Sequence, residues 1–152
     1  MNAIRRRAIE GLEQGDTFEI KRTFSEADIV QFEPLSHDHN PVHSDAGYAV
    51  AKGFDGTIAQ GLLTATLITG IGGIGGQLGW LATSMSFKFK RPVYVGEELT
   101  CVWAIVRIDD RHRAKAEVIV KNSTGQAVLL AETTEVIPSE VERAVLAATP
   151  GD

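Results

Sequence analysis

The side chains best suited to acid–base chemistry are concentrated in one short polar loop. Residues 36–43 read Ser-His-Asp-His-Asn-Pro-Val-His and include three of the four histidines of the chain. Asp38 and His43 are five residues apart, and Pro41 between them restricts the shape of the backbone. A carboxylate and an imidazole on such a bent loop can point into one pocket and touch the same water molecule. The spacing therefore predicts a site that moves protons to and from water.

The histidines of this loop also suggest a second chemistry, metal binding. His37, His39 and His43 could supply imidazole ligands, but the sequence offers no matching second cluster of ligands elsewhere. Cys101, the single cysteine, lies within an apolar stretch typical of a buried strand. We therefore expect no metal site and an unreactive core thiol.

The elements on either side of the loop must hold it in place. Asp16–Phe24 alternates apolar and polar residues, which predicts a half-buried strand, and Ser25 is suited to cap a helix over Glu26–Leu35. Beyond the loop, the polar side chains of Ile58–Ile71 are confined to one glutamine and three threonines. Such a helix is apolar nearly all round and has to be enclosed by a sheet.

The second half of the chain can supply that sheet. Stretches rich in valine, isoleucine and threonine predict four strands, at Thr83–Lys90, Glu97–Ile108, Ala114–Lys121 and Ala127–Ile137. Turn-forming residues connect the last three strands, which favours an antiparallel meander, and a short helix is expected at Ser139–Leu146.

Composition limits the remaining possibilities. With 152 residues, 43 % of them hydrophobic, we expect one domain over residues 1–152, in which 1–15 and 147–152 are peripheral or frayed. A net charge of -5 argues against nucleic acid as a partner, and we read Arg5, Arg6 and Arg7 as a solvated charge run. No apolar run reaches the length of a signal or membrane segment, so we expect a cytoplasmic protein that does not bind a membrane.

The loop resembles the hydratase signature of the MaoC-like family, in which Asp is followed by Asn-Pro two residues on and by His five residues on. Two further stretches are similar to segments of that family: Ile58–Leu63, which opens the predicted helix, and Phe89–Leu99. The resemblance implies an α+β hotdog fold, with a curved antiparallel sheet wrapped around a long buried central helix. It also implies reversible, (R)-specific hydration of trans-2-enoyl thioesters, without a cofactor other than the coenzyme A or acyl carrier protein of the substrate.

The resemblance assigns roles to individual residues. Asp38 and His43 would place water and proton on one face of the double bond, and which of them is the formal base stays open. The backbone N–H of Gly61 would hold the thioester oxygen, while Asn40 and Thr69 would orient the loop or contact the substrate. The family usually has His before this glycine where the present chain has Gln60, which alters the local hydrogen bonding.

Two surfaces are expected to bind partners, one the carrier of the substrate and the other a second copy of the chain. Lys88, Lys90 and Arg91 would either attract the phosphates of coenzyme A or form a solvated strand face. A curved meander leaves strand edges and an apolar face unprotected, so we expect a homodimer in which two sheets join edge to edge.

Other activities remain in competition with hydration. The same site run in reverse would make a 3-hydroxyacyl-thioester dehydratase of fatty-acid synthesis. A thioesterase must aim water at the carbonyl carbon, which the Asp38–His43 loop argues against. A non-catalytic subunit that binds acyl thioesters would be favoured if Asp38 or His43 were missing, and both are present.

Overall fold

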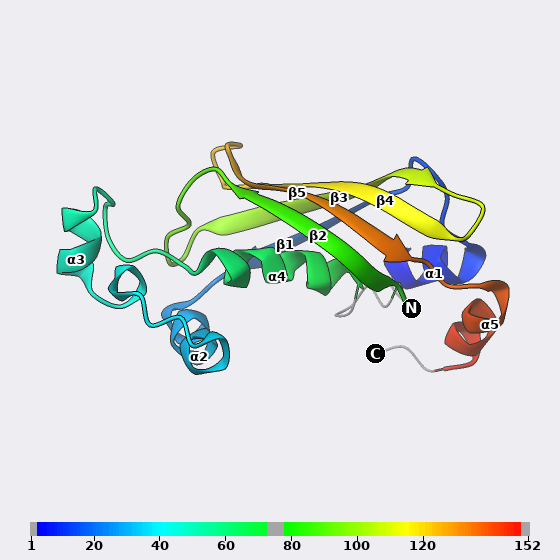
Figure 1. The fold of residues 1–152 in the computed structure, drawn as a ribbon, viewed down its shortest axis with the longest axis horizontal. Coiled ribbons are helices and arrows are strands. Elements are labelled where there is room, and N and C mark those ends of the chain that lie inside the picture. Colours follow the sequence, from blue (N-terminus) through cyan, green and yellow to red (C-terminus); the bar gives the residue numbers. More distant parts are fainter. Residues whose placement is uncertain (1–2, 73–77, 150–152) are drawn as a thin grey trace.

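A computed structural model describes residues 3–72 and 78–149 of the chain. One sheet lies over the helix α4, with α2 and α3 at one end of the molecule and α1 and α5 at the other (Figure 1). The α-helices are α1 (Ala3–Glu10), α2 (Glu26–Ser36), α3 (Ala46–Ala51), α4 (Gly61–Gly72) and α5 (Glu140–Ala148), and a 3-10 turn, η1, spans Pro41–His43. The strands are β1 (Thr17–Thr23), β2 (Leu81–Phe89), β3 (Glu98–Ile108), β4 (Arg113–Lys121) and β5 (Ala127–Val136).

The five strands form one antiparallel sheet in the order β1-β3-β4-β5-β2. The predicted meander is confirmed for β3, β4 and β5. Strand β2 follows α4 in the chain but pairs with β5, with Phe87 opposite Ala131, so it forms one edge of the sheet. Strand β1 pairs with β3 and forms the other edge.

The inner face of the sheet packs on α4 and builds the core. Alternate residues of β3 point inward and are fully buried, with Trp103 the largest of them, whereas the residues between them are half-buried on the outer face. From α4, Leu67, Ile68 and Ile71 fill the space beneath the sheet. This arrangement confirms the predicted hotdog fold, in which a curved sheet wraps a central helix.

The central helix begins three residues later than predicted. Ile58 is bridged to Tyr94, and the Ala59 N–H donates to the Val93 carbonyl at 2.8 Å. These bonds hold the preceding residues in an extended conformation, so α4 starts at Gly61.

No helix within 3–72 and 78–149 is both long and apolar enough to cross a membrane.

One side of α4 lies open in the single chain. The helix packs mainly against β1 and β3, and it leaves the inner side of β2 largely uncovered. Leu62 of α4 is 57 % exposed, while Met85 and Phe89 of β2 are 37 % and 54 % exposed. A single copy of this fold therefore buries the side of α4 that faces the sheet and leaves Leu62 exposed.

The N-terminal arginines are not a solvated charge run. Arg5 is 3 % exposed and donates to the carbonyls of Leu146 and Thr149 at 2.7 and 2.6 Å, and Arg7 pairs with Asp16 at 2.9 Å. The Arg5 bonds dock α1 beside α5, so α1 is held in place by contacts that are distant in sequence. The expectation of frayed ends also covered residues 1–2 and 150–152, which lie outside the described residues.

Glu135 is a buried carboxyl on the inner face of β5. It is 0 % exposed, and neither of its side-chain oxygens has a hydrogen-bond partner among the described residues. Burial raises the pKa of Glu135 to about 7. The nearby Thr133 hydroxyl opposes part of the rise in pKa, although its geometry falls short of a hydrogen bond.

We expect the free energy of unfolding to fall as pH rises from about 4.5, the ordinary value of a glutamate pKa, to about 7. Between these two pH values the unfolded chain releases the Glu135 proton while the folded protein keeps it, so the free energy of unfolding falls. Above about pH 7 both states have released the proton and the free energy of unfolding falls no further. At about 1.4 kcal/mol per pH unit, the loss is about 3 kcal/mol, and Glu135→Gln should remove it. Urea unfolding at pH 5 and 8 measures the difference, with exposed Glu117→Gln as control. If the free energy of unfolding depended on pH equally in Glu135→Gln and Glu117→Gln, the raised pKa would not belong to Glu135.

Candidate active site

The polar loop is aimed by the way α2 begins and ends. Ser25 and Asp28 form a reciprocal capping box at the start of α2. At the other end, His37 adopts a left-handed conformation with φ of 55°, which turns the chain out of the helix. The Asp38 N–H then donates to Ser36 Oγ at 3.3 Å, so the first catalytic candidate follows directly after a fixed helix end.

Asn40 and Pro41 shape the rest of the loop. The Asn40 N–H donates to Asp38 Oδ1 at 3.3 Å, and Asn40 Oδ1 accepts from the Val42 N–H at 3.2 Å, which caps η1. Pro41 is the first residue of that turn, where its missing N–H costs nothing. The side chain of Asn40 therefore bonds to the backbone of the loop between Asp38 and His43.

Asp38 and His43 face each other across the loop. His43 Nε2 lies 3.4 Å from Asp38 Oδ2, and the side chains of His43 and Asp38 are 11 % and 41 % exposed. On its other side, His43 Nδ1 lies 2.7 Å from the Ile58 carbonyl oxygen. A carbonyl can only accept, so Nδ1 carries the proton, and in the neutral ring the lone pair is on Nε2. The imidazole therefore presents its basic nitrogen to Asp38.

This pair opens into a cavity of about 530 Å³. Gly61, Leu62 and Thr64 of α4 contribute one wall. The rest comes from the end of β2 with the segment after it and from apolar side chains near the loop: Phe54, Ile58, Ala59, Phe89, Lys90, Arg91, Pro92, Val93 and Val128. A carboxylate, an imidazole and the first residue of a helix thus meet in a largely apolar chamber, which suits reactions that develop charge on a substrate oxygen.

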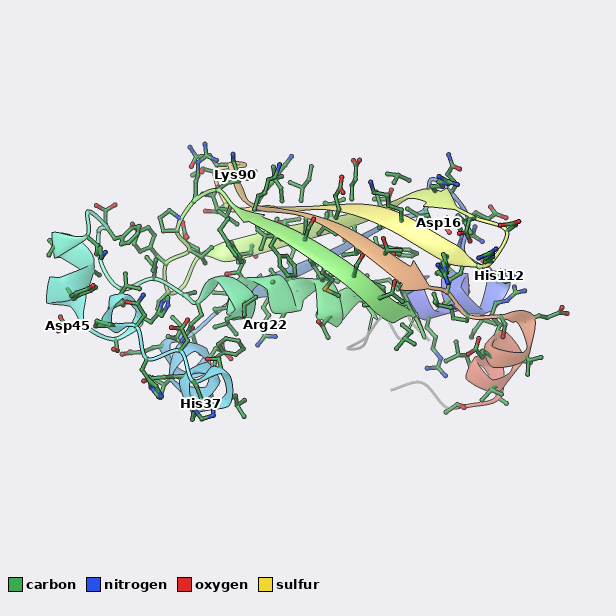
Figure 2. All side chains as sticks on the ribbon, in the orientation of Figure 1. Asp16, Arg22, His37, Asp45, Lys90 and His112 are labelled. Carbon is green, nitrogen blue, oxygen red and sulfur yellow. The ribbon has the colours of Figure 1, made fainter. Side chains whose placement is uncertain are left out.

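The cavity brings together some of the residues predicted for the site. Gly61, Lys90 and Arg91 line it with Asp38 and His43. Asn40 is outside its lining, and Thr69 is exposed on α4 away from it. Figure 2 shows Lys90 beyond the end of β2 and His37 near the end of α2.

Lys88 does not act with the other two cations. It lines a separate depression on the outer face of the sheet, with Glu117 and Ile119 among its neighbours. Side chains alternate between the two faces of a strand, so Lys88 points away from its neighbour Phe89, which lines the cavity. The predicted cluster of three cations is therefore reduced to Lys90 and Arg91.

Several residues that line the cavity were not predicted from the sequence. They are Phe54, Thr64 and Phe89, which lie in a predicted loop, helix and strand and had been given no function. The inward direction of Phe89 could have been found from strand alternation once the register of β2 was known. The Ile58 carbonyl that orients His43 leaves no signal, because every residue has a carbonyl.

The other loop histidines are directed elsewhere. His39 Nδ1 lies 2.8 Å from Glu33 Oε1, and its side chain is 64 % exposed. The rings of His37 and His39 meet edge to face with centroids 6.3 Å apart. Within the described ranges, no three His, Cys, Asp or Glu side chains are grouped so as to hold a metal ion.

Comparison with known proteins gives one family. Residues 10–128 match the MaoC-like domain family. The (R)-specific enoyl-CoA hydratase of Aeromonas caviae is 36 % identical over 94 residues, 60 % of this chain and 69 % of that protein. The mitochondrial 3-hydroxyacyl-[acyl-carrier-protein] dehydratase FERN of Solanum lycopersicum is 32 % identical over 134 residues, 86 % of this chain and 80 % of that protein. The unliganded R-hydratase PhaJ1 of Pseudomonas aeruginosa superposes with a TM-score of 0.78 at 30 % identity, over 87 % of this chain and 86 % of that one.

The hydrogen bond to Ile58 predicts the tautomer of His43. At a pH where the ring is neutral, we expect the proton on Nδ1 and a bare Nε2, because only Nδ1 faces a carbonyl oxygen. Long-range ¹H–¹⁵N correlation spectra distinguish the two ring nitrogens, and exposed His112 serves as the comparison. A neutral His43 protonated on Nε2 would refute the geometry.

Proposed function

Because this chain belongs to the MaoC-like family, and is therefore an enzyme of the hydratase and dehydratase type, we propose that it is an (R)-specific enoyl-CoA hydratase. It adds water reversibly to trans-2-enoyl thioesters and uses no cofactor beyond the thioester carrier. The observation that carries the proposal is the opposition of Asp38 Oδ2 and His43 Nε2 at 3.4 Å, in a cavity also lined by Gly61.

The acid–base pair acts on one water molecule. Asp38 Oδ2 and the lone pair of His43 Nε2 both accept hydrogen bonds, so a water between them is held by its two protons with its oxygen directed at the substrate. The water oxygen bonds to the β carbon, the double bond is consumed, and one water proton passes through the pair to the α carbon. Hydroxyl and proton arrive from the same side, since both groups belong to one loop.

Gly61 stabilises the charge that develops on the thioester oxygen. As the first residue of α4, its N–H has no acceptor within the helix and lies at the positive end of the helix dipole. Removal of a comparable donor in other enzymes costs on the order of 3 kcal/mol of transition-state stabilisation. A backbone donor of this kind stabilises the transition state by about as much as an acid–base group does.

The same site could run the reaction in either direction and on either thioester carrier. Relatives include both a CoA hydratase and an acyl-carrier-protein dehydratase, and hydration is reversible. We favour coenzyme A, because Lys90 and Arg91 line the cavity and can pair with its phosphates. Comparison of crotonyl-CoA with crotonyl-acyl-carrier protein distinguishes the two carriers.

A second copy of this chain is proposed to complete the fold as a homodimer. Among the strands that the structure describes, β2 has a neighbour on one side only, so a row of its backbone groups is unpaired. Beside this edge, Leu62, Met85 and Phe89 expose apolar surface on the inner side of the sheet. Antiparallel pairing of β2 with its symmetry mate would satisfy the edge and cover these side chains.

Purified protein should hydrate crotonyl-CoA to the (R)-3-hydroxybutyryl product, and Asp38→Asn and His43→Gln should each lower kcat by about 10²–10⁴-fold because each removes one acid–base group. Loss of absorbance of the conjugated thioester gives the rate, and chiral chromatography gives the configuration. His39→Gln, in the same loop but outside the cavity, is the matched control. An (S) product, release of free coenzyme A, or full activity in either folded variant would count against the proposal.

The dimer should weaken when Met85 is replaced by glutamate, because two carboxylates would then be buried near the symmetry axis. Sedimentation equilibrium measures the association, with Val141→Glu on α5 as control, since Val141 is 75 % exposed and far along the chain from β2. A monomeric parent protein, or equal association of both variants, would reject this interface.

A further inference from the structure

Phe89 occupies the space beside the proposed oxyanion donor. A Cβ atom at position 61 would lie 2.8, 3.0 and 3.1 Å from Cε1, Cζ and Cδ1 of the Phe89 ring. The first of these contacts is closer than real Cβ atoms come and the other two are unusually tight, so the ring would have to move to admit a side chain at position 61. Gly61 and Phe89 thus form one wall of the cavity, with the ring against the helix backbone.

The sheet holds this ring in position. Phe89 pairs with Leu129 at the end of the β2–β5 ladder, and the Lys90 N–H donates to the Val128 carbonyl at 2.8 Å directly after it. The Phe87 ring, partly buried against the core, stacks on Phe89 with centroids 6.2 Å apart and an interplanar angle of 24°. Although Phe89 is 54 % exposed, its ring is supported on two sides.

The position of the ring has a consequence for the substrate. With the thioester oxygen on the Gly61 N–H, the α carbon is bonded to the carbonyl carbon and lies at the same wall. A hydrogen on that carbon needs no further room, whereas a methyl group that points at this wall would meet the Phe89 ring. The Phe87 ring that stacks on Phe89 opposes its displacement.

We propose that Phe89 is a specificity-determining residue that restricts the enzyme to enoyl thioesters unsubstituted at the α carbon. The inference rests on the proposed hydration at this site. In both substrate classes the water oxygen bonds to the β carbon and a proton to the α carbon, so the same bonds form and break. A difference between the classes that depends on residue 89 therefore reports the shape of the cavity.

The test compares kcat/KM for tiglyl-CoA, which carries an α-methyl group, with kcat/KM for crotonyl-CoA. The ratio of the two should rise at least tenfold in Phe89→Ala, because one methyl group in an apolar pocket is worth about 10–200-fold. The lower intrinsic reactivity of the branched substrate is common to all variants and cancels. Phe89→Leu should raise the ratio less, and Phe89→Tyr, which keeps the ring, should leave it unchanged.

Lys88→Ala is the matched control, since Lys88 is the neighbour of Phe89 on the same strand but faces the other side of the sheet and does not line the cavity. Its ratio should equal that of the parent. Thermal unfolding identifies any variant that fails to fold, and Phe89→Leu decides the question if Phe89→Ala does fail. Hydration of crotonyl-CoA with an unchanged ratio in the folded Phe89 variants overturns this inference alone. No hydration of crotonyl-CoA by the parent protein overturns the proposed function and this inference with it.

Discussion

The site depends on one short extended segment, Ile58–Ala59, at which three parts of the chain meet. The Ile58 N–H donates to the Val42 carbonyl at 3.2 Å, and the Ile58 carbonyl accepts from His43 Nδ1. The next residue, Ala59, donates to Val93 at 2.8 Å, after which α4 begins. The polar loop, the segment after β2 and the start of the central helix are thereby fixed to one another by backbone groups, and the cavity is the space between them.

The same segment sets the electrostatics of the site. Its carbonyl selects the nitrogen of His43 that carries the proton, and its end places Gly61 at the positive end of α4. Nearby, Gln60 is 1 % exposed and donates from Nε2 to the Ile29 carbonyl of α2 at 3.2 Å. This bond ties α2, which precedes the loop, to the residue directly before α4. Glutamine in place of the family's usual histidine thus serves here as a link between α2 and the start of α4.

The cavity and the open edge of the sheet belong to the same side of the structure. Because α4 packs on β1 and β3, the inner side of β2 is free both to form the cavity wall at Phe89 and to leave Met85 exposed. A second copy placed on β2 would therefore lie close to the substrate wall. The opposite end of the sheet is closed by α1 and α5, where Arg5 joins the two ends of the chain.

Local pattern was sufficient for much of the fold and for the centre of the site. The alternation in β1, the capping residue Ser25 and the apolar composition of α4 predicted elements that formed within a few residues of the expected bounds. The loop motif predicted that Asp38 and His43 would face one cavity, because five residues and one proline leave the chain few shapes. Each of these features is set by neighbours in the sequence.

Tertiary structure decided what depends on partners far along the chain. The pairing of β2 with β5 directs Phe89 into the cavity and Lys88 to the other face, and no local pattern specifies that register. Arg5 is buried because carbonyls near residue 146 accept its hydrogen bonds, and Glu135 is buried because the inner face of β5 carries it into the core. The sequence determined which residues could do the chemistry, whereas packing determined which of them share a cavity, because contacts between distant segments form only when the sheet closes over the helix.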